Sequence, residues 1–179
     1  MRNAIIVDLD QTVALEKFNE DLPQNSSREE WNKFHEKRGY YSLEYFTPIY
    51  ETIDVVEGYY NSFKFDIPTV IFMTAREDTH NGLIRLNSYR FIKKYFKNFN
   101  NVGAYNSAYK LLMRKENDYR SSSEVKQDML NEIIEQGYRP LIVFDDDDNN
   151  RQMFLNNGIT VFQVFSKDYH NFIKGNKYE

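Results

Sequence analysis

The chain has 179 residues, of which 41% are hydrophobic and 16% aromatic, enough to build one sizeable core and to argue against disorder. It contains no cysteine, which excludes disulfides, zinc sites built from thiolates and a cysteine nucleophile. Only the short apolar run at residues 4–7 precedes the first aspartate, too few residues for a signal peptide or a membrane span. We therefore expect a soluble protein of the cytoplasm.

The formal net charge of −4 is unevenly distributed. Residues 79–115 contain no Asp or Glu and carry a charge of +8, so the remainder of the chain carries −12. A basic face on an acidic body can attract a polyanion. An ordinary solvated helix face would give the same pattern, and the sequence leaves both interpretations open.

The first expected strand is the β-branched run at residues 5–7, which does not alternate with polar residues and is therefore expected to be buried on both faces. Asp8 and Asp10 follow where this strand ends. Their side chains, two residues apart in an extended segment, point the same way, with Cα atoms roughly 7 Å apart. Two carboxylates directed at one space repel each other, so a positive group is expected between them. The alternative is an ordinary strand end with acidic caps for the next element.

Residues 14–47 are polar, show no obvious strands and are expected to form a small, mainly helical cap insert in a single domain of residues 1–179. Ser27 and Glu30 form a possible capping box, after which Trp31 and Phe34 fall on one helix face. We expect these two aromatics to pack against the body of the protein. The aromatic run at residues 40–46 fits either packing or a lid whose rings, such as Tyr40 and Tyr41, stack on a base.

Beyond the insert, helical and extended patterns alternate. Pro48 is suited to begin a helix that runs to residue 60. Further helices are expected at 83–99, 124–136 and 149–156, and strands at 69–74, 108–113, 141–144 and 160–164. Strands that alternate with helices predict an α/β fold with a parallel sheet wound right-handed.

Polar residues follow the carboxyl ends of these strands, where sites form in open parallel sheets. They are Asp8, Asp10 and Thr12 after the first strand, Thr74 and Arg76 after the second, Arg114, Asp118 and Arg120 after the third, and Asp145 and Asp146 after the fourth, with Lys126 opening the helix between the last two. A purely structural sheet would need none of these groups at one edge, so their concurrence predicts a functional site.

Four carboxylates at one edge, those of Asp8, Asp10, Asp145 and Asp146, cannot all ionise without a cation. Hard oxygen ligands and the lack of thiolates favour Mg²⁺. A calcium loop is disfavoured because neither aspartate cluster has the glycine at the sixth position that such a loop needs. Mg²⁺ with a lysine and hydroxyls nearby suits phosphoryl transfer.

The order DLDQT, a strand ending in TAR, Lys126 and then FDDDD resembles the haloacid dehalogenase (HAD) superfamily of phosphatases with an aspartate nucleophile. More narrowly, LLMRKENDYRSSSEVK and IVFDDDDNNRQMFLNNGITVFQV resemble the 3′-phosphatase domain of phage-type polynucleotide kinase-phosphatases. The resemblance implies a Rossmann-like fold, with a central five-stranded parallel sheet flanked by helices and a cap after the first strand. No GxxxxGK[ST] loop is present, so no kinase domain is expected in these residues. The Asn-, Lys- and Tyr-rich composition fits a phage or another low-GC source, and a phage source would place the protein in the host cytoplasm.

The resemblance also implies a role for each residue of the site. Asp8 would attack the phosphorus and form an aspartyl-phosphate, and Asp10 would protonate the leaving oxygen and then activate water. Thr74 and Lys126 would hold phosphoryl oxygens. The metal would be bound by Asp8, the Asp10 backbone carbonyl, Asp145 and Asp146, and the substrate by Thr12, Arg76, Arg114 and Arg120.

Three positions depart from the family pattern. Gln11 replaces the usual glycine after the second aspartate, and Ser122 replaces an aspartate four residues before the lysine. Asn19 stands where an arginine is expected in the insert, and Lys17 or Arg28 are the possible substitutes. These departures leave the phosphatase chemistry intact and bear on specificity for polynucleotides.

Three functions therefore compete. The first is removal of 3′-phosphates from DNA or RNA ends, and the second is the same chemistry on a nucleotide or other small phosphomonoester, as in a 5′-nucleotidase. The third is a receiver-like phospho-acceptor without turnover, although in receivers the acidic pair comes early in the chain rather than late. The expected partner is a phosphorylated nucleic-acid end or a nucleotide, with no membrane; the sequence carries no signal from which a protein partner could be predicted. The three histidines, His35, His80 and His170, form no ligand pattern.

Overall fold

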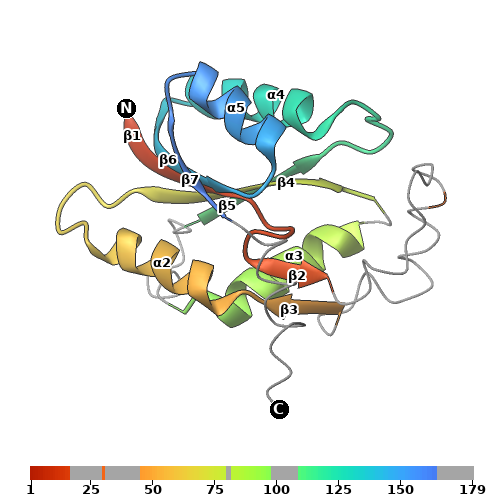
Figure 1. Ribbon diagram of the computed structural model, residues 1–179, viewed down its shortest axis with the longest axis horizontal. Coiled ribbons are helices and arrows are strands. Elements are labelled where there is room, and N and C mark those ends of the chain that lie inside the picture. Colours follow the sequence, from red (N-terminus) through yellow and green to blue (C-terminus); the bar gives the residue numbers. More distant parts are fainter. Residues whose placement is uncertain (17–29, 31–44, 80–81, 98–108, 165–179) are drawn as a thin grey trace, which may run out of the picture.

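The computed structural model describes residues 1–16, 30, 45–79, 82–97 and 109–164. Its centre is a parallel sheet of five strands in the order β5-β4-β1-β6-β7 (Figure 1). The strands are β1 (Arg2–Val7), β4 (Thr69–Glu77), β5 (Tyr109–Arg114), β6 (Tyr138–Asp145) and β7 (Thr160–Gln163). The sequence-based prediction of an α/β fold with a five-stranded parallel sheet is confirmed.

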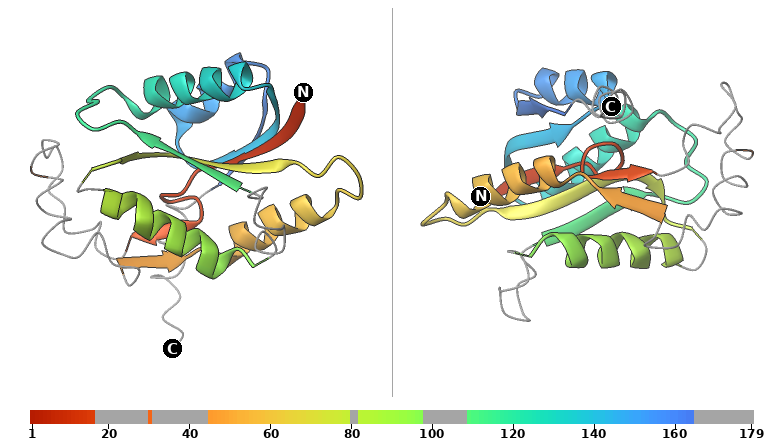
Figure 2. Two further views of the ribbon diagram at one scale, coloured as in Figure 1. Left: turned by 180° about the vertical axis from the view of Figure 1, so that it is seen from behind. Right: turned by 60° about the horizontal axis from the view of Figure 1, so that its bottom comes forward.

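Two pairs of helices cover the two faces of the sheet (Figures 1 and 2). Helices α2 (Tyr50–Asn61) and α3 (Leu83–Tyr95) lie on one face, and α4 (Ser122–Glu135) and α5 (Asp148–Asn156) lie on the other. Ile5 and Val7 of β1 belong to the core under α2 and α3, whereas Ala4 and Ile6 belong to the core under α4 and α5. Because β1 is buried on both faces, its sequence is apolar without alternation, as predicted.

The element boundaries shift by a few residues from those expected. β4 continues to Glu77 and β6 already begins at Tyr138. α4 begins earlier than expected because Ser121 and Glu124 form a capping box: the Ser121 hydroxyl accepts from the Glu124 amide, and the Glu124 carboxylate accepts from the Ser121 amide. α3 ends at Tyr95, where the next residue turns into extended backbone.

The two ends of the predicted insert pair with each other. β2 (Ala14–Glu16) runs antiparallel to β3 (Phe46–Pro48) in a separate two-stranded sheet. The sequence showed neither strand, because three residues are too few for a periodicity to appear. Pro48 therefore ends β3 and does not begin a helix; α2 starts two residues later, at Tyr50.

The insert itself falls largely outside the described residues. The expected helix with Trp31 and Phe34, the aromatics Tyr40 and Tyr41, and the insert cations all lie there, so the extent and role of the cap stay predictions. Tyr45 and Phe46 are described, and both are buried in the core. Of the two interpretations of the aromatic run, these two residues therefore follow the first: they pack in the core.

Within the part of the chain that the structure describes, no helix combines the length and the apolar character needed to cross a membrane.

Candidate active site

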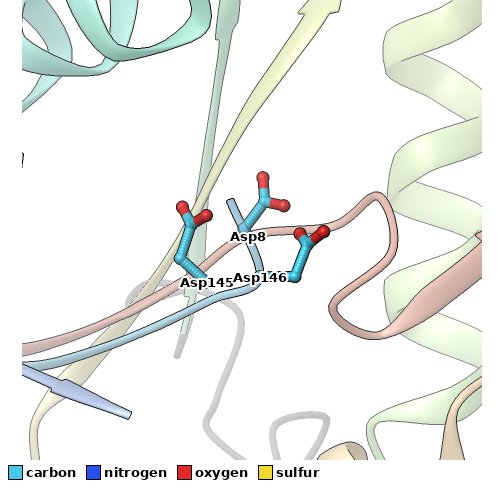
Figure 3. A group of neighbouring side chains, drawn as sticks. All are labelled: Asp8, Asp145 and Asp146. Atoms are coloured by element: carbon cyan, nitrogen blue, oxygen red, sulfur yellow. The ribbon is translucent and has the colours of Figure 1, made fainter. Parts of the chain in front are cut away.

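Three carboxylates meet where the central strand and its neighbour end. Asp8 follows β1, Asp145 is the last residue of β6, and Asp146 comes next. β1 and β6 are hydrogen-bonded neighbours, and the Asp8 amide donates to the Phe144 carbonyl at 2.9 Å. One oxygen from each of the three carboxylates lies within 4.8 Å of the other two, and Figure 3 shows the side chains turned to the same side of the strand ends. The predicted meeting of the first and fourth strand ends is thus observed.

Lys126 joins this group from α4. Its Nζ atom donates to Asp8 Oδ1 at 2.7 Å and to Asp145 Oδ2 at 2.8 Å, and its side chain is 2% exposed. The helix can bury a lysine here because its neighbour Val125 and the following Met129 anchor α4 to the sheet. Burial by itself would lower the pKa of Lys126, but Asp145 and Asp8 outweigh it and raise that pKa above its usual value. Lys126 is therefore an ammonium group.

The carboxylates nevertheless hold more negative charge than Lys126 can neutralise. Burial raises the pKa of Asp8 well above its usual value of 3.8; Lys126 opposes this shift, and Asp145 and Asp146 add to it. Burial and the charge of Asp145 likewise raise the pKa of Asp146 to about 6. The Thr12 hydroxyl lies 3.2 Å from Asp8 Oδ2 and 3.1 Å from Asp146 Oδ1. With one proton, it serves one of the two carboxylates at a time.

The second aspartate of the DLDQT motif has a different environment. Both oxygens of Asp10 lie 2.9 Å from Arg76 Nε, and Oδ1 lies 2.6 Å from Nη2. Thr74 Oγ1 donates to Asp10 Oδ2 at 3.2 Å. The Arg76 guanidinium also lies over the Phe46 ring, 4.1 Å from its centroid, and donates to Ser88 Oγ at 2.9 Å. Arg76, which was expected to meet substrate, is thus buried against the carboxylate of the acid–base candidate.

The departure at Gln11 has a conformational meaning. Its φ is +60°, in the left-handed region, where glycine is free of the steric cost that other residues incur, roughly 1–2 kcal/mol. The chain turns directly after Asp10, and Gln11 adopts this conformation without being glycine.

Sequence reasoning missed several residues of the site. Asp145 Oδ1 accepts from the Asp147 amide at 3.0 Å and from Asn150 Nδ2 at 3.2 Å, which fixes the carboxylate. Asn150 is 2% exposed, and among the described residues its Oδ1 atom has no hydrogen-bond partner. Its position in the first turn of the helix after the acidic run was the available signal. Phe46 and Ser88, which hold Arg76, come from β3 and α3 and gave no sequence signal.

For two predicted substrate-binding arginines, the structure shows partners outside the group of Asp8, Asp145 and Asp146. Arg114 is buried and donates to three backbone carbonyls, those of Ala75 at 2.9 Å, Asp118 at 2.9 Å and Arg120 at 2.6 Å. Arg120 is half exposed and pairs with Asp118 at 2.7 Å and with Asp128 at 2.8 Å. Arg120 lowers the pKa of Asp118 to about 2.

The donor set fits a hard divalent cation. The ligand atoms at hand are carboxylate oxygens of Asp8, Asp145 and Asp146. When all three carboxylates are ionised, Lys126 neutralises one of their charges and Arg76 neutralises Asp10, so the three carboxylates together with Lys126 carry a net charge of about −2. Since the Asp10 carboxylate faces Arg76, its backbone carbonyl is the group left for the predicted metal contact.

Comparisons with known proteins identify the family of the chain. The family model for the polynucleotide kinase PNKP phosphatase domain matches residues 2–169. No curated protein sequence gives a significant match. A chain from a structure of the Pnkp1/Rnl/Hen1 RNA repair complex is similar in fold, with a TM-score of 0.62 and 23% identity over 92% of this chain and 42% of that one. A chain from a second Pnkp1/Rnl/Hen1 complex has a TM-score of 0.61 and 24% identity, over 92% and 46%.

This chain therefore spans less than half of the length of these solved chains. The fold, the carboxylate cluster with its lysine, and a family match over nearly all residues agree: the chain belongs to the family of PNKP phosphatase domains.

Proposed function

We propose that this domain is a Mg²⁺-dependent phosphomonoesterase that removes 3′-phosphates from DNA or RNA ends through an aspartyl-phosphate. The observation that carries the proposal is the group of Asp8, Asp145 and Asp146 around the Lys126 ammonium, with Asp10 held separately by Arg76. The proposal gives the two aspartates of DLDQT distinct roles, and their environments support that division.

Asp8 is the nucleophile in this mechanism. Its carboxylate is oriented by Lys126 on Oδ1 and reached by the Thr12 hydroxyl on Oδ2. A carboxylate oxygen attacks phosphorus and forms the acyl phosphate while the bond to the 3′ oxygen breaks. Asp10 gives its proton to that leaving oxygen. A water then attacks the phosphorus, Asp10 takes a proton from it, and inorganic phosphate and the free Asp8 carboxylate are released.

The groups around the reacting phosphoryl have complementary tasks. Lys126 and the Thr74 hydroxyl are the donors proposed for its oxygens. Bound by Asp8, Asp145, Asp146 and the Asp10 carbonyl, Mg²⁺ would supply positive charge to the phosphoryl oxygens. Arg76, supported by Phe46 and Ser88, keeps the Asp10 carboxylate in place between the two steps.

The distribution of cations supports a nucleic-acid substrate. Of the basic segment at residues 79–115, Arg85 pairs with Asp78 at 2.7 Å and Arg114 is buried, so the segment does not form one continuous face. Four cations along α3 and just beyond it are exposed to solvent: Arg90, Lys93, Lys94 and Lys97. They offer a polyanion a local positive surface on an acidic protein. The family is named for a polynucleotide enzyme, and both solved chains come from Pnkp1/Rnl/Hen1 complexes, one named for RNA repair.

A substrate panel tests the proposal. Turnover is compared for a 3′-phosphorylated oligonucleotide, a mononucleotide and an aryl phosphate, each with Mg²⁺ and with EDTA. We expect the oligonucleotide to be preferred, to be inhibited by salt more than the small substrates are, and to require the metal. A mononucleotide preferred by a wide margin would contradict the polynucleotide assignment, and a single turnover would contradict phosphatase function altogether.

The second candidate is a 5′-nucleotidase or other small-molecule phosphatase. The formal net charge of −4 favours it, because an acidic protein repels a long polyanion except at local basic surfaces. We place the activity in the cytoplasm, which is that of the host if the source is a phage.

A further inference from the structure

The loop between β5 and α4, residues 115–121, stands at the same edge of the sheet as the site. It leaves the carboxyl end of β5 after Arg114 and leads directly into the helix that carries Lys126 (Figure 1). Its side chains are mostly exposed, and among them is one aromatic residue, Tyr119, which is 70% exposed. An exposed aromatic ring on a loop at the edge of the sheet that carries the proposed phosphoryl site is a candidate for a binding role.

This loop is tied down at several points. The buried Arg114 guanidinium binds the carbonyls on both sides of Tyr119, those of Asp118 at 2.9 Å and Arg120 at 2.6 Å. The Asn117 amide donates to Glu77 Oε1 at 2.6 Å, and Asn117 itself has a φ of +62°. The Tyr119 hydroxyl donates to Asn117 Oδ1 at 3.2 Å. These hydrogen bonds therefore hold the backbone that carries the exposed ring in one conformation.

The same arginine connects the loop to the reaction centre. Arg114 Nε donates to the Ala75 carbonyl at 2.9 Å, and Ala75 lies between Thr74, a proposed phosphoryl donor, and Arg76, which holds Asp10. One buried side chain thus sets the position of the loop relative to the end of β4. This accounts for Arg114 as a positioning residue rather than a phosphate ligand.

We propose that Tyr119 is a stacking platform for a nucleobase at or next to the phosphorylated 3′ end. Every base offers a π-face, so an aromatic platform accepts any sequence, as an end-processing enzyme requires. Because the loop is already ordered, the ring can bind a base without the entropic cost of fixing a mobile segment. This inference rests on the proposed 3′-phosphatase function and assigns a base-binding subsite to it.

The test compares ends with and without a base. Wild-type protein, Tyr119→Ala and Tyr119→Trp are assayed on a 3′-phosphorylated oligonucleotide, on the same oligonucleotide with abasic residues at its last two positions, and on glycerol phosphate. We expect Tyr119→Ala to lower kcat/KM on the normal end by roughly 5- to 100-fold, mainly through KM, because stacking on one base is lost. Tyr119→Trp should keep kcat/KM on the normal end near the wild-type value, and neither variant should change the rate on glycerol phosphate.

A matched control is Phe65→Ala. Phe65 is 85% exposed but lies in the loop between α2 and β4, at the opposite edge of the sheet, and we expect its removal to change none of the three rates. Tyr119→Ala should also leave the rate on the abasic end unchanged.

Equal losses on normal and abasic ends, or no loss on either, would overturn the platform. So would a wild-type protein that does not distinguish the two ends. These outcomes, seen while the normal end is still hydrolysed, leave the proposed function intact. Hydrolysis of glycerol phosphate but of neither oligonucleotide would overturn the polynucleotide assignment together with the platform.

Discussion

The two aspartates of DLDQT stand two residues apart, and the structure gives them opposite surroundings. The first side, the group of Asp8, Asp145, Asp146 and Lys126, is largely buried, and its three carboxylates carry more negative charge than its one lysine neutralises. The second side, the pair of Asp10 and Arg76, has one carboxylate and one guanidinium, so its charges balance, and Asp10 is partly open to solvent. The comparison teaches that sequence proximity does not imply shared surroundings, which suits the separate roles we propose: cation binding on the first side and proton transfer on the second.

The largest effect should come from removing the carboxylate at the centre of the first side. We expect Asp8→Asn to lower kcat on the oligonucleotide by roughly 10⁴-fold or more, because no acyl phosphate can form. Circular dichroism should show an unchanged fold, since the amide keeps the size and one acceptor of the original group. Rapid-quench trapping of phosphorylated wild type but not of the variant is the direct measurement. Activity near the wild-type value would remove Asp8 as nucleophile.

The second prediction concerns Lys126, whose loss should damage stability as well as activity. Lys126→Ala leaves Asp8 and Asp145 buried without their partner, which should cost about 3–5 kcal/mol of unfolding free energy. Urea denaturation in EDTA measures the loss. The matched control is the same substitution in an Asp8→Asn background, where less charge is stranded and the loss should be clearly smaller. Equal losses in the two backgrounds would contradict the excess of charge inferred for this side.

On the second side, Arg76→Ala should act through Asp10 and therefore depend on the leaving group. Glycerol phosphate has a poor leaving group that needs a proton, so its kcat should fall by roughly 10²-fold or more. p-Nitrophenyl phosphate has a good leaving group, and its kcat should fall about tenfold less. A matched Arg85→Ala variant loses a different ion pair, between α3 and Asp78 just after β4, and should not discriminate between the two substrates. Equal losses with Arg76→Ala would argue for a direct phosphate contact.

The sequence predicted the first side better than the second, and the reason is physical. Asp8, Lys126, Asp145 and Asp146 come from strand ends and a helix start, whose meeting follows from the topology of a parallel sheet. Phe46 and Ser88 hold Arg76 from β3 and α3, and no local pattern marks a residue that acts through a packing contact. Arg114 and Arg120 were predicted as substrate ligands because arginines after a strand suit phosphate. Burial and backbone carbonyls, visible only in three dimensions, give Arg114 another task.

The smallest effect should be a pH-dependent change in stability without metal. The pKa of Asp146 is raised from 3.8 to about 6 in the folded protein, so the folded state keeps a proton that the unfolded state loses between these values. Stability is therefore lost as pH rises through this window, and the penalty is complete above about pH 6. Asp146→Asn lacks the penalty but keeps an oxygen for the Thr12 hydroxyl.

In EDTA, thermal melting should find Asp146→Asn equal to wild type near pH 4 and more stable above pH 6. The gain should be about 1 kcal/mol, or ~2–4 °C, since Asp146 is only partly buried and solvent screens its charge. Millimolar Mg²⁺ at pH 7.5 should reverse the order, because the cation stabilises a wild-type cluster that has all three carboxylates. If Asp146→Asn were less stable than wild type in EDTA at every pH, the Asp146 charge would not destabilise the folded protein. The first side would then lack the excess negative charge that distinguishes it from the second.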